Sequence, residues 1–329
     1  MKSPITPLAA ATLSESSSLA RLQQVVVLMA FVAAATWLWW MAPRSVAWAV
    51  AGVAVVFLGY AVILAVEMVA AAVVNRDDPA PSANAAHWIS AWWQEVRVAP
   101  LVFAWRQPFC WRQLPDSAEA QVSQRAVVLI HGFVCNRGFW LPWMRRLRAL
   151  KVPYVSLNLE PIFGSIDEYV PLVDAAVARA TALTGLAPTL ICHSMGGLAA
   201  RAWLASSPGA ASRIDKVITI GTPHRGTWLA RFSHLNNGRQ MRHDCDWQQD
   251  LRSRELLLHA ERNADRFVCW YSNTDNIVFP ASTATLPGSD NRLVAGAPHV
   301  ALAFHPRVMD ESLAMVASGS SSPSERTAS

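Results

Sequence analysis

Charged residues are scarce in this chain of 329 residues: Asp, Glu, Lys and Arg together make up 16% of it, while hydrophobic residues make up 53%. The net charge is +5, but the basic residues are scattered and form no dense run. Because a nucleic-acid-binding surface needs a stripe of positive charge, we expect no nucleic-acid partner. A mildly basic surface beside anionic lipid is the simpler interpretation of the charge.

Cysteine is also sparse, and its spacing contains no paired motif. The chain has five cysteines and no C-x-x-C pair: Cys110, Cys135, Cys192, Cys245 and Cys269. An odd number without such a pair argues against a disulfide framework and against a cysteine-based zinc site. From the sequence we therefore expect neither a metal nor a cofactor.

Charge is missing entirely from two long stretches. Residues 25–42 (VVVLMAFVAAATWLWWMA) and 46–66 (VAWAVAGVAVVFLGYAVILAV) are apolar, and residues 43–45 (PRS) form a turn between them. A membrane-spanning helix needs about 20 apolar residues, so the sequence predicts a transmembrane helical hairpin over 25–74. A cleaved signal peptide followed by one helix is the alternative. It is disfavoured because the preceding residues are weakly basic and no A-x-A site precedes a polar start.

The segments beside the hairpin are polar or rich in tryptophan. Residues 1–24 and 318–329 are predicted to be disordered tails, and 75–122 to hold a Pro-rich linker and then a helix within HWISAWWQEVRV. Helical spacing puts five apolar side chains on one face of it: Trp88, Ile89, Trp92, Trp93 and Val96. This helix either lies at the membrane interface or packs on the following domain, and the stripe alone does not distinguish the two.

Residues 123–317 have the pattern of an α/β domain. Apolar, β-branched runs predict six strands, at 125–133, 153–159, 189–194, 216–223, 266–275 and 291–299. Helical stretches at 139–150, 167–184 and 195–206 lie between the early strands. Strands without polar alternation, separated by helices, predict a doubly wound, mostly parallel sheet. The Arg- and His-rich stretch 227–262 breaks this rhythm and is predicted to be a cap inserted above the sheet.

Three residues with complementary chemistry follow strands of this sheet. Ser194 follows the third strand, Asp275 the fifth and His299 the sixth, and ligands bind at the carboxyl ends of parallel strands. A serine hydroxyl needs a base to take its proton, and a carboxylate holds that base in the right tautomer. The alternative for Ser194 is an ordinary helix cap, but its place in a strand–turn–helix with Gly196 and Gly197 favours a nucleophile.

The turn around the serine also supplies backbone donors. The N–H of Met195 and that of Phe133, in the loop after the first strand, are the candidates for stabilising an oxyanion. The strict motif G-x-S-x-G has glycine where this chain has Cys192. The cysteine side chain is small, so the crowding it causes is modest.

The chain here resembles a known family. The stretches VVLIHGFVCNRGFW, ICHSMGGLAARAWL, VITIGTPHRGT, SNTDNIVFP and GAPHVALAFHP are similar to bacterial triacylglycerol lipases and esterases of the α/β-hydrolase fold, over about residues 123–315. The resemblance implies hydrolysis of carboxylic esters, with acyl or lipid esters as substrates, through an acyl-enzyme. It places Ser194, Asp275 and His299 on the nucleophile, acid and base. Some relatives bind a structural calcium, whose ligands are not matched here.

Several alternatives remain open at this stage. Asp244, Asp246 and Asp250 compete with Asp275 for the acid, and His305 competes with His299 for the base. His131 and His193 are expected to be structural, His224 to brace the site by hydrogen bonding, and Cys135 and Cys192 to be packing residues. Acyl transfer and thioester hydrolysis use the same triad, and a non-catalytic membrane scaffold could keep the same fold.

Two further expectations concern the membrane. Arg21 and Arg76 outside the spans, against Arg44 in the turn, weakly favour both termini in the cytoplasm of a protein integral to a bacterial inner membrane. Unpaired cysteines agree. The 85–98 helix and the 227–262 insertion are expected to shape an acyl-binding entrance, with apolar residues that form either a mobile lid or a rigid cap: Trp228, Leu229, Phe232 and Leu235.

Overall fold

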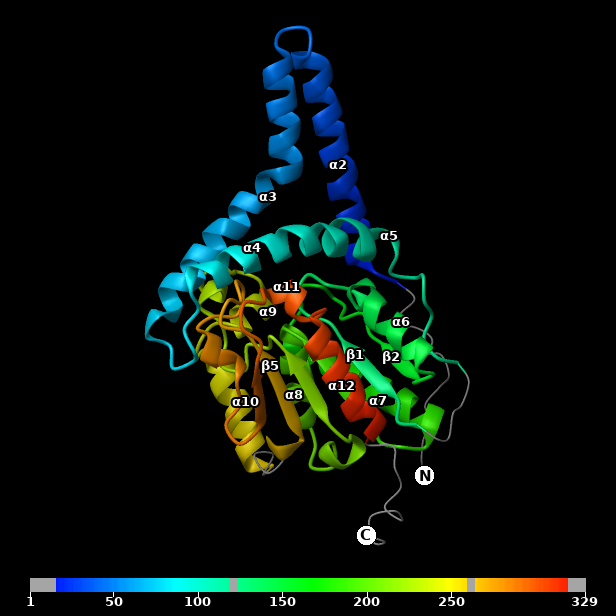
Figure 1. Cartoon of the computed structure of the whole chain (residues 1–329). Coiled ribbons are helices and arrows are strands. Elements are labelled where there is room, and N and C mark those ends of the chain that lie inside the picture. The colour runs from blue at the N-terminus through cyan, green and yellow to red at the C-terminus, as the bar shows by residue number, and fades with distance from the viewer. Residues whose placement is uncertain (1–15, 119–123, 259–263, 319–329) are drawn as a thin grey trace.

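The computed structural model describes residues 16–118, 124–258 and 264–318. A helical hairpin projects from an α/β domain, and a further helix, α4, crosses between the two (Figure 1). The strands are β1 (Val127–Ile130), β2 (Tyr154–Ser156), β3 (Thr189–His193), β4 (Val217–Ile220), β5 (Phe267–Tyr271) and β6 (Asp290–Leu293).

All six strands pair in parallel, in the order β2-β1-β3-β4-β5-β6. The prediction of a doubly wound parallel sheet is therefore confirmed. Strands β1 to β4 are buried throughout, as expected for apolar strands covered on both faces. The strand order reverses between β1 and β3, and the crevice at such a point is where open α/β sheets bind ligands.

Helices cover both faces of the sheet and form two cores with it. One core packs α7 (Val170–Thr184) and α8 (Met195–Leu204) on residues such as Val128 and Leu190. The other packs α6 (Leu141–Ala149) and α12 (Pro306–Ser318) on residues such as Leu129 and Ile218. The shorter helices of the domain are η4 (Arg137–Trp140), η5 (Ile166–Tyr169), η6 (Ala211–Arg213), η9 (Ala281–Ala284) and α11 (His299–Leu302).

The hairpin consists of α2 (Ser18–Met41) and α3 (Val46–Val74). The prediction that all of 1–24 is a disordered tail is wrong for residues 18–24, which are the first turns of α2; residues 1–15 lie outside the described part. The side chain of Ser17 caps the helix by accepting from the Ala20 N–H. A Cβ on Gly52 would lie 1.8 Å from the Trp37 indole nitrogen, so glycine is what lets the two helices approach.

The first turns of α2 dock on the domain. The Ser18 N–H and hydroxyl donate to Glu160, at 2.9 and 2.6 Å. Gln24 donates to the carbonyl of Pro108, at 2.7 Å. Leu19 is 1% exposed. These contacts end just before the uncharged run that starts at residue 25.

A Trp-rich helical segment lies between the hairpin and the domain (Figure 1). It runs from η2 (Asn75–Asp77) through α4 (Ala85–Pro100), the π-helix η3 (Leu101–Arg106) and α5 (Gln107–Phe109). The Trp92 indole donates to Ala61 of α3, at 2.8 Å, while Ala91 and Val102 are fully buried. Its remaining side is apolar and exposed: Ile89, Trp93, Leu101, Trp105 and Phe109. The helix thus packs on the protein with one side and leaves an apolar stripe uncovered on the other.

The 227–262 insertion forms η7 (Trp228–Phe232), α9 (Asn236–Gln240) and α10 (Asp246–Leu257). We expected the insertion above the sheet; α10 differs from this expectation, because it packs beside α8, where Arg201 forms two 2.8 Å hydrogen bonds with Glu255. The helix that crosses the carboxyl end of the sheet is instead α4 (Figure 1). Residues 259–263 and the predicted tail at 319–329 lie outside the described residues.

Candidate active site

Ser194 sits in a strained turn between β3 and α8. Its φ of 53° and ψ of −129° lie in a region that residues with a side chain rarely occupy. The sheet fixes this backbone from one side, because the Ser194 N–H donates to Ile220 of β4, at 2.9 Å. The serine is 6% exposed. Such a turn lifts a hydroxyl from the end of the sheet.

At the two glycines that follow Met195, a side chain would collide with neighbouring atoms. A Cβ on Gly196 would lie 2.4 Å from the carbonyl oxygen of Ile130, and one on Gly197 would lie 2.3 Å from Thr222 Oγ1. Cys192, in contrast, is fully buried in the core shared with α7 and α8. Burial raises the pKa of its thiol, so it is a neutral packing residue, as predicted.

Asp275 and His299 are joined by a buried hydrogen bond. His299 Nδ1 donates to Asp275 Oδ2 at 2.8 Å, and the two residues are 5% and 2% exposed. The other carboxylate oxygen accepts from the N–H groups of Ile277 and Val278, at 2.9 and 2.7 Å. With Nδ1 so engaged, the imidazole has only Nε2 left for proton transfer.

The charge around His299 favours its protonated form. Burial lowers the pKa of the imidazole, but the nearby carboxylates, Asp275 foremost, outweigh burial and raise the pKa above its ordinary value. A histidine held in this way is a stronger base than one in water. It is also better able to carry a proton during a reaction.

Gly221 connects the serine to this pair. It follows Ile220, the residue that accepts from Ser194 N–H, and its φ is +58°. A Cβ there would lie 3.1 Å from Asp275 Oδ2 and 3.2 Å from His299 Nδ1. Among the described residues, no hydrogen bond joins Ser194 Oγ to His299. Contacts of this kind are often long before substrate binds.

Phe133 and Met195 follow the two strands that flank the point where strand order reverses. Gly132 precedes Phe133, and a Cβ on it would lie 2.7 Å from Ser194 Cβ, so the β1 loop passes directly beside the serine. In the part of the chain that the structure describes, no protein acceptor receives a hydrogen bond from the backbone N–H of Phe133 or of Met195. Both donors are therefore available to a ligand.

Three histidines near the strand ends are held neutral. Burial lowers the pKa of His131 to about 4; its Nε2 accepts from Leu159 N–H at 3.0 Å. Burial also lowers the pKa of His193, which donates through Nε2 to the carbonyl of His299 at 3.2 Å. His224 interacts with Thr219 at 3.1 Å and, with its pKa lowered by burial, is neutral as well. All three act on structure through hydrogen bonds.

The alternative acids and base lie elsewhere. Asp244 pairs with Arg252 at 3.3 Å, and Asp250 pairs with Arg254 at 2.9 Å, on the exposed side of the insertion. Asp246 begins α10. His305 precedes α12 and its carbonyl accepts from Met309 N–H, at 3.0 Å. Asp275 is the carboxylate that contacts His299.

Sequence reasoning missed three polar residues beside the Asp275–His299 pair. Glu67 of α3 accepts from Asn276 Nδ2 at 2.8 Å, and Asn276 Oδ1 accepts from His299 N–H at 3.2 Å. Glu95 of α4 accepts from the N–H groups of Val300 and Ala301, at 2.9 and 3.1 Å. The available signal was that each glutamate is the one acidic residue within a helix of otherwise apolar or tryptophan-rich sequence.

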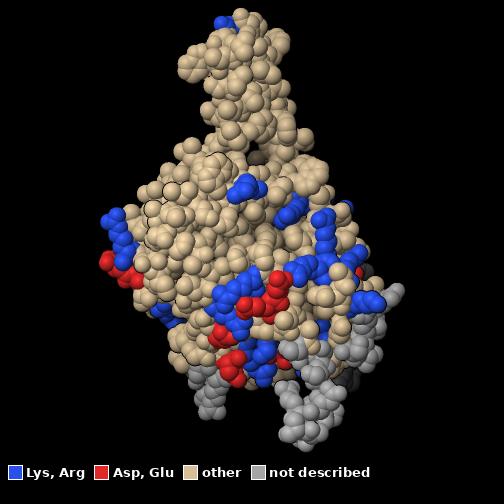
Figure 2. All heavy atoms as spheres, in the orientation of Figure 1, with Lys and Arg blue, Asp and Glu red and all other residues tan. Residues whose placement is uncertain are grey.

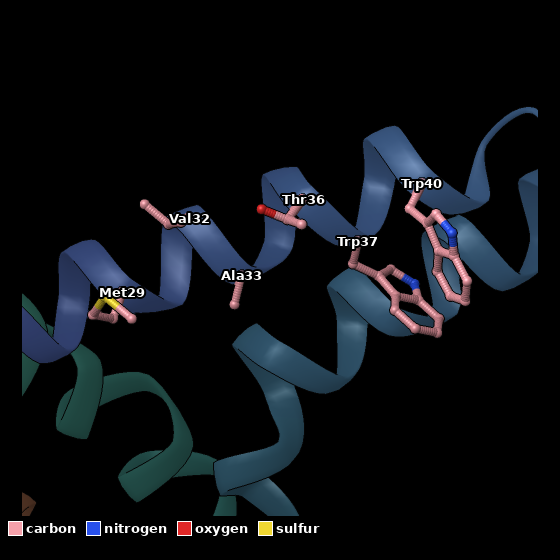
Figure 3. A pocket seen from close by; sticks show the side chains of 6 residues that line it. All are labelled: Met29, Val32, Ala33, Thr36, Trp37 and Trp40. Carbon is pink, nitrogen blue, oxygen red and sulfur yellow. The ribbon is translucent and has the colours of Figure 1, made fainter.

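An apolar groove of about 320 Å³ lies on the hairpin, away from these residues. Figure 3 shows the α2 side chains that line it: Met29, Val32, Ala33, Thr36, Trp37 and Trp40. None of them comes from a strand end. In the described ranges, no group of three or more His, Cys, Asp and Glu residues is arranged to hold a metal ion.

Comparisons with known proteins agree with this architecture. Residues 186–256 match the family described as a PGAP1-like alpha/beta domain. Bacillus licheniformis lipase BlEst2 in its mature form has a similar structure: the TM-score is 0.52 at 14% identity, over 62% of this chain and 96% of that one. Aspergillus fumigatus lipase B gives 0.51 at 16% identity, over 61% and 55%. No curated protein matches the sequence significantly. The likeness establishes the α/β-hydrolase fold.

Proposed function

We propose that this protein is a membrane-anchored serine hydrolase that cleaves carboxylic esters of acyl or lipid type. The observation that carries the proposal is the strained Ser194 turn next to the buried Asp275–His299 pair. Holding a serine at positive φ costs free energy, on the order of 1–3 kcal/mol. That cost is understandable where the serine must be presented to a substrate.

In the proposed reaction, His299 Nε2 takes the proton of Ser194 as Oγ attacks the ester carbonyl. Asp275 accepts the Nδ1–H, keeps the tautomer and stabilises the imidazolium. The N–H groups of Phe133 and Met195 stabilise the oxyanion. His299 then gives its proton to the leaving alcohol, and the acyl group stays on Ser194. Water, activated by the same histidine, releases the acid and restores the serine.

The comparisons support this proposal through the fold and through the printed names of the two similar structures, both lipases. The fold by itself hosts many activities. The residue roles therefore rest on the geometry described above.

The membrane part of the proposal rests on the hairpin. Both α2 and α3 are long and apolar enough to cross a membrane. The run 46–66 would extend about 31 Å as a helix, close to the roughly 30 Å of a bilayer's hydrocarbon core. Figure 2 shows that the projecting hairpin is free of charge except at its far end, and Arg44 is the one charged residue between 25 and 66. An exposed apolar surface of this extent indicates contact with the hydrocarbon core of a membrane.

We place the exposed stripe of α4, η3 and α5 at the membrane interface, on the cytoplasmic side. Trp93 and Trp105 are 51% and 58% exposed, and tryptophan favours the interface. The substrate would then be an ester held in or near the bilayer.

The test uses the full-length protein in detergent, with p-nitrophenyl esters of rising chain length and a fluorophosphonate probe. Ser194→Ala should lower kcat by about 10⁴-fold or more and abolish labelling, while thermal unfolding stays close to that of the unchanged protein. Ser206→Ala, just after the C-terminal end of α8, is the matched control and should keep both the kcat and the labelling of the unchanged protein. Label on another residue, or active protein without label, would refute the assignment.

A further inference from the structure

The N-terminal helices reach the candidate site through two carboxylates. Glu67, at the domain end of α3, accepts from Asn276, and Asn276 in turn accepts from the backbone N–H of His299. Asn276 directly follows Asp275. This chain of hydrogen bonds therefore connects the hairpin to both members of the Asp275–His299 pair.

Glu95 reaches the same place from α4. It is 1% exposed, and each of its carboxylate oxygens accepts one N–H from the first turn of α11, at Val300 and Ala301. His299 is the first residue of α11. The turn is only four residues long, so its direction depends on what holds it from outside.

We propose that Glu67 and Glu95 are positioning residues for His299, so that the N-terminal helices complete the active site of the hydrolase domain. The inference rests on the proposed function and goes beyond it. The hairpin is then more than an anchor: its second helix, α3, together with α4, holds the proposed base in place.

The arrangement fixes His299 from both its side chain and its backbone. Asp275 holds the ring at Nδ1, Asn276 holds the backbone N–H, and Glu95 holds the two residues that follow. A displacement of about 1 Å at a reacting group can cost 10²-fold in rate. When ionised, each glutamate also places negative charge near the ring and favours the imidazolium that forms during attack.

Packing alone does not explain these residues. Burial raises the pKa of Glu95 to about 7, which shows how strongly the site disfavours its charge. The apolar residues Ala91 and Val102 already anchor this helical segment. An apolar side chain would be the less costly choice at position 95 if packing were the only requirement.

The experiment compares four variants of the full-length protein in nanodiscs. Glu95→Gln keeps the volume but leaves one N–H of α11 facing an amide NH₂. Glu67→Leu removes the acceptor for Asn276 and suits an apolar helix. The matched controls are Glu160→Gln, which loosens the docking of α2, and Glu255→Gln, which weakens the Arg201 pair; neither glutamate contacts His299.

For the two test variants we expect kcat to fall about ten- to hundredfold, with KM little changed. The acid limb of the kcat/KM profile should move to lower pH, because the imidazolium loses a neighbouring carboxylate that stabilises it when ionised. The controls should lower the temperature of unfolding without moving that limb. Unchanged kcat and an unchanged limb in both folded test variants would overturn the proposal.

A second measurement does not need turnover. Nuclear magnetic resonance with ¹⁵N-histidine, assigned with His299→Asn, follows the titration of His299 and its Nδ1 proton bonded to Asp275. We expect the titration to move to lower pH in both test variants and to stay in place in both controls. If the unchanged protein cleaves no ester, the proposed function fails while this titration still decides the role of the glutamates. A His299 titration that stays in place in both test variants would reject the positioning role of Glu67 and Glu95.

Discussion

Asp275 and His299 meet through a 2.8 Å hydrogen bond in a place that water hardly reaches. The carboxylate also accepts two backbone N–H groups, so its orientation is fixed before any substrate arrives. The bond leaves Nε2 of the imidazole as the ring nitrogen for the proposed proton exchange with Ser194.

The pH dependence of ester cleavage should report this pair. The proposed base works only when neutral, and the pKa of His299 is raised above 6.5, so kcat/KM should fall as pH drops through that raised pKa. Asp275→Asn removes the charge that raises the pKa most, so the limb should move to lower pH and kcat should drop by up to about 10⁴-fold. Asp244→Asn, in the insertion, is the control. A limb that moves to higher pH in Asp275→Asn would contradict the assignment.

The strained turn at Ser194 can be tested by a substitution at Gly196. Gly196→Ala would bring a methyl group to 2.4 Å from the backbone oxygen of Ile130, so either the turn shifts or the protein unfolds more easily. Overpacking of this kind typically costs about 1–3 kcal/mol. We expect a lower temperature of unfolding and loss of fluorophosphonate labelling. Gly209→Ala, where a Cβ meets nothing within 4 Å, should change neither. Full labelling in Gly196→Ala would show that the turn tolerates a side chain.

The anchor can be tested by fractionation. Full-length protein should remain with membranes through a carbonate wash, because removing the two apolar runs from lipid would expose them to water. Sequencing the mature N-terminus provides the control for a cleaved signal peptide. Recovery in the wash supernatant, or a mature chain that begins after residue 42, would disprove the anchor.

The sheet was predictable because its strands are short apolar runs whose burial does not depend on distant detail. Val127–Ile130 and Val217–Ile220 are apolar, β-branched runs of the kind that is typical of buried strands. The motif rule was less reliable at Cys192, where glycine is not required because the side chain points into the core, whereas at Gly196 a backbone oxygen excludes one. Whether glycine is required depends on the free space around the Cβ position, and a sequence motif does not record that space.

The roles of Glu67 and Glu95 were not predictable for a different reason. Their partners lie 209 and 205 or 206 residues away along the chain. Local periodicity places a glutamate on a helix face but says nothing about what that face meets. The same limit applies to residues 18–24: their polar composition resembles a free tail, whereas in the structure they are helical and dock on Glu160 and Pro108.

The hairpin is fastened to the domain at two places, through α2 at Glu160 and through α3 at Asn276. A domain hung from one flexible tether could turn and sample any height above a bilayer. Two fixed points remove that freedom and set the serine at one constant level relative to the apolar runs. In a membrane, the enzyme would then select its substrates by depth: an ester bond would be cleaved when it lies at the level of the site, whatever the length of the chain beyond it.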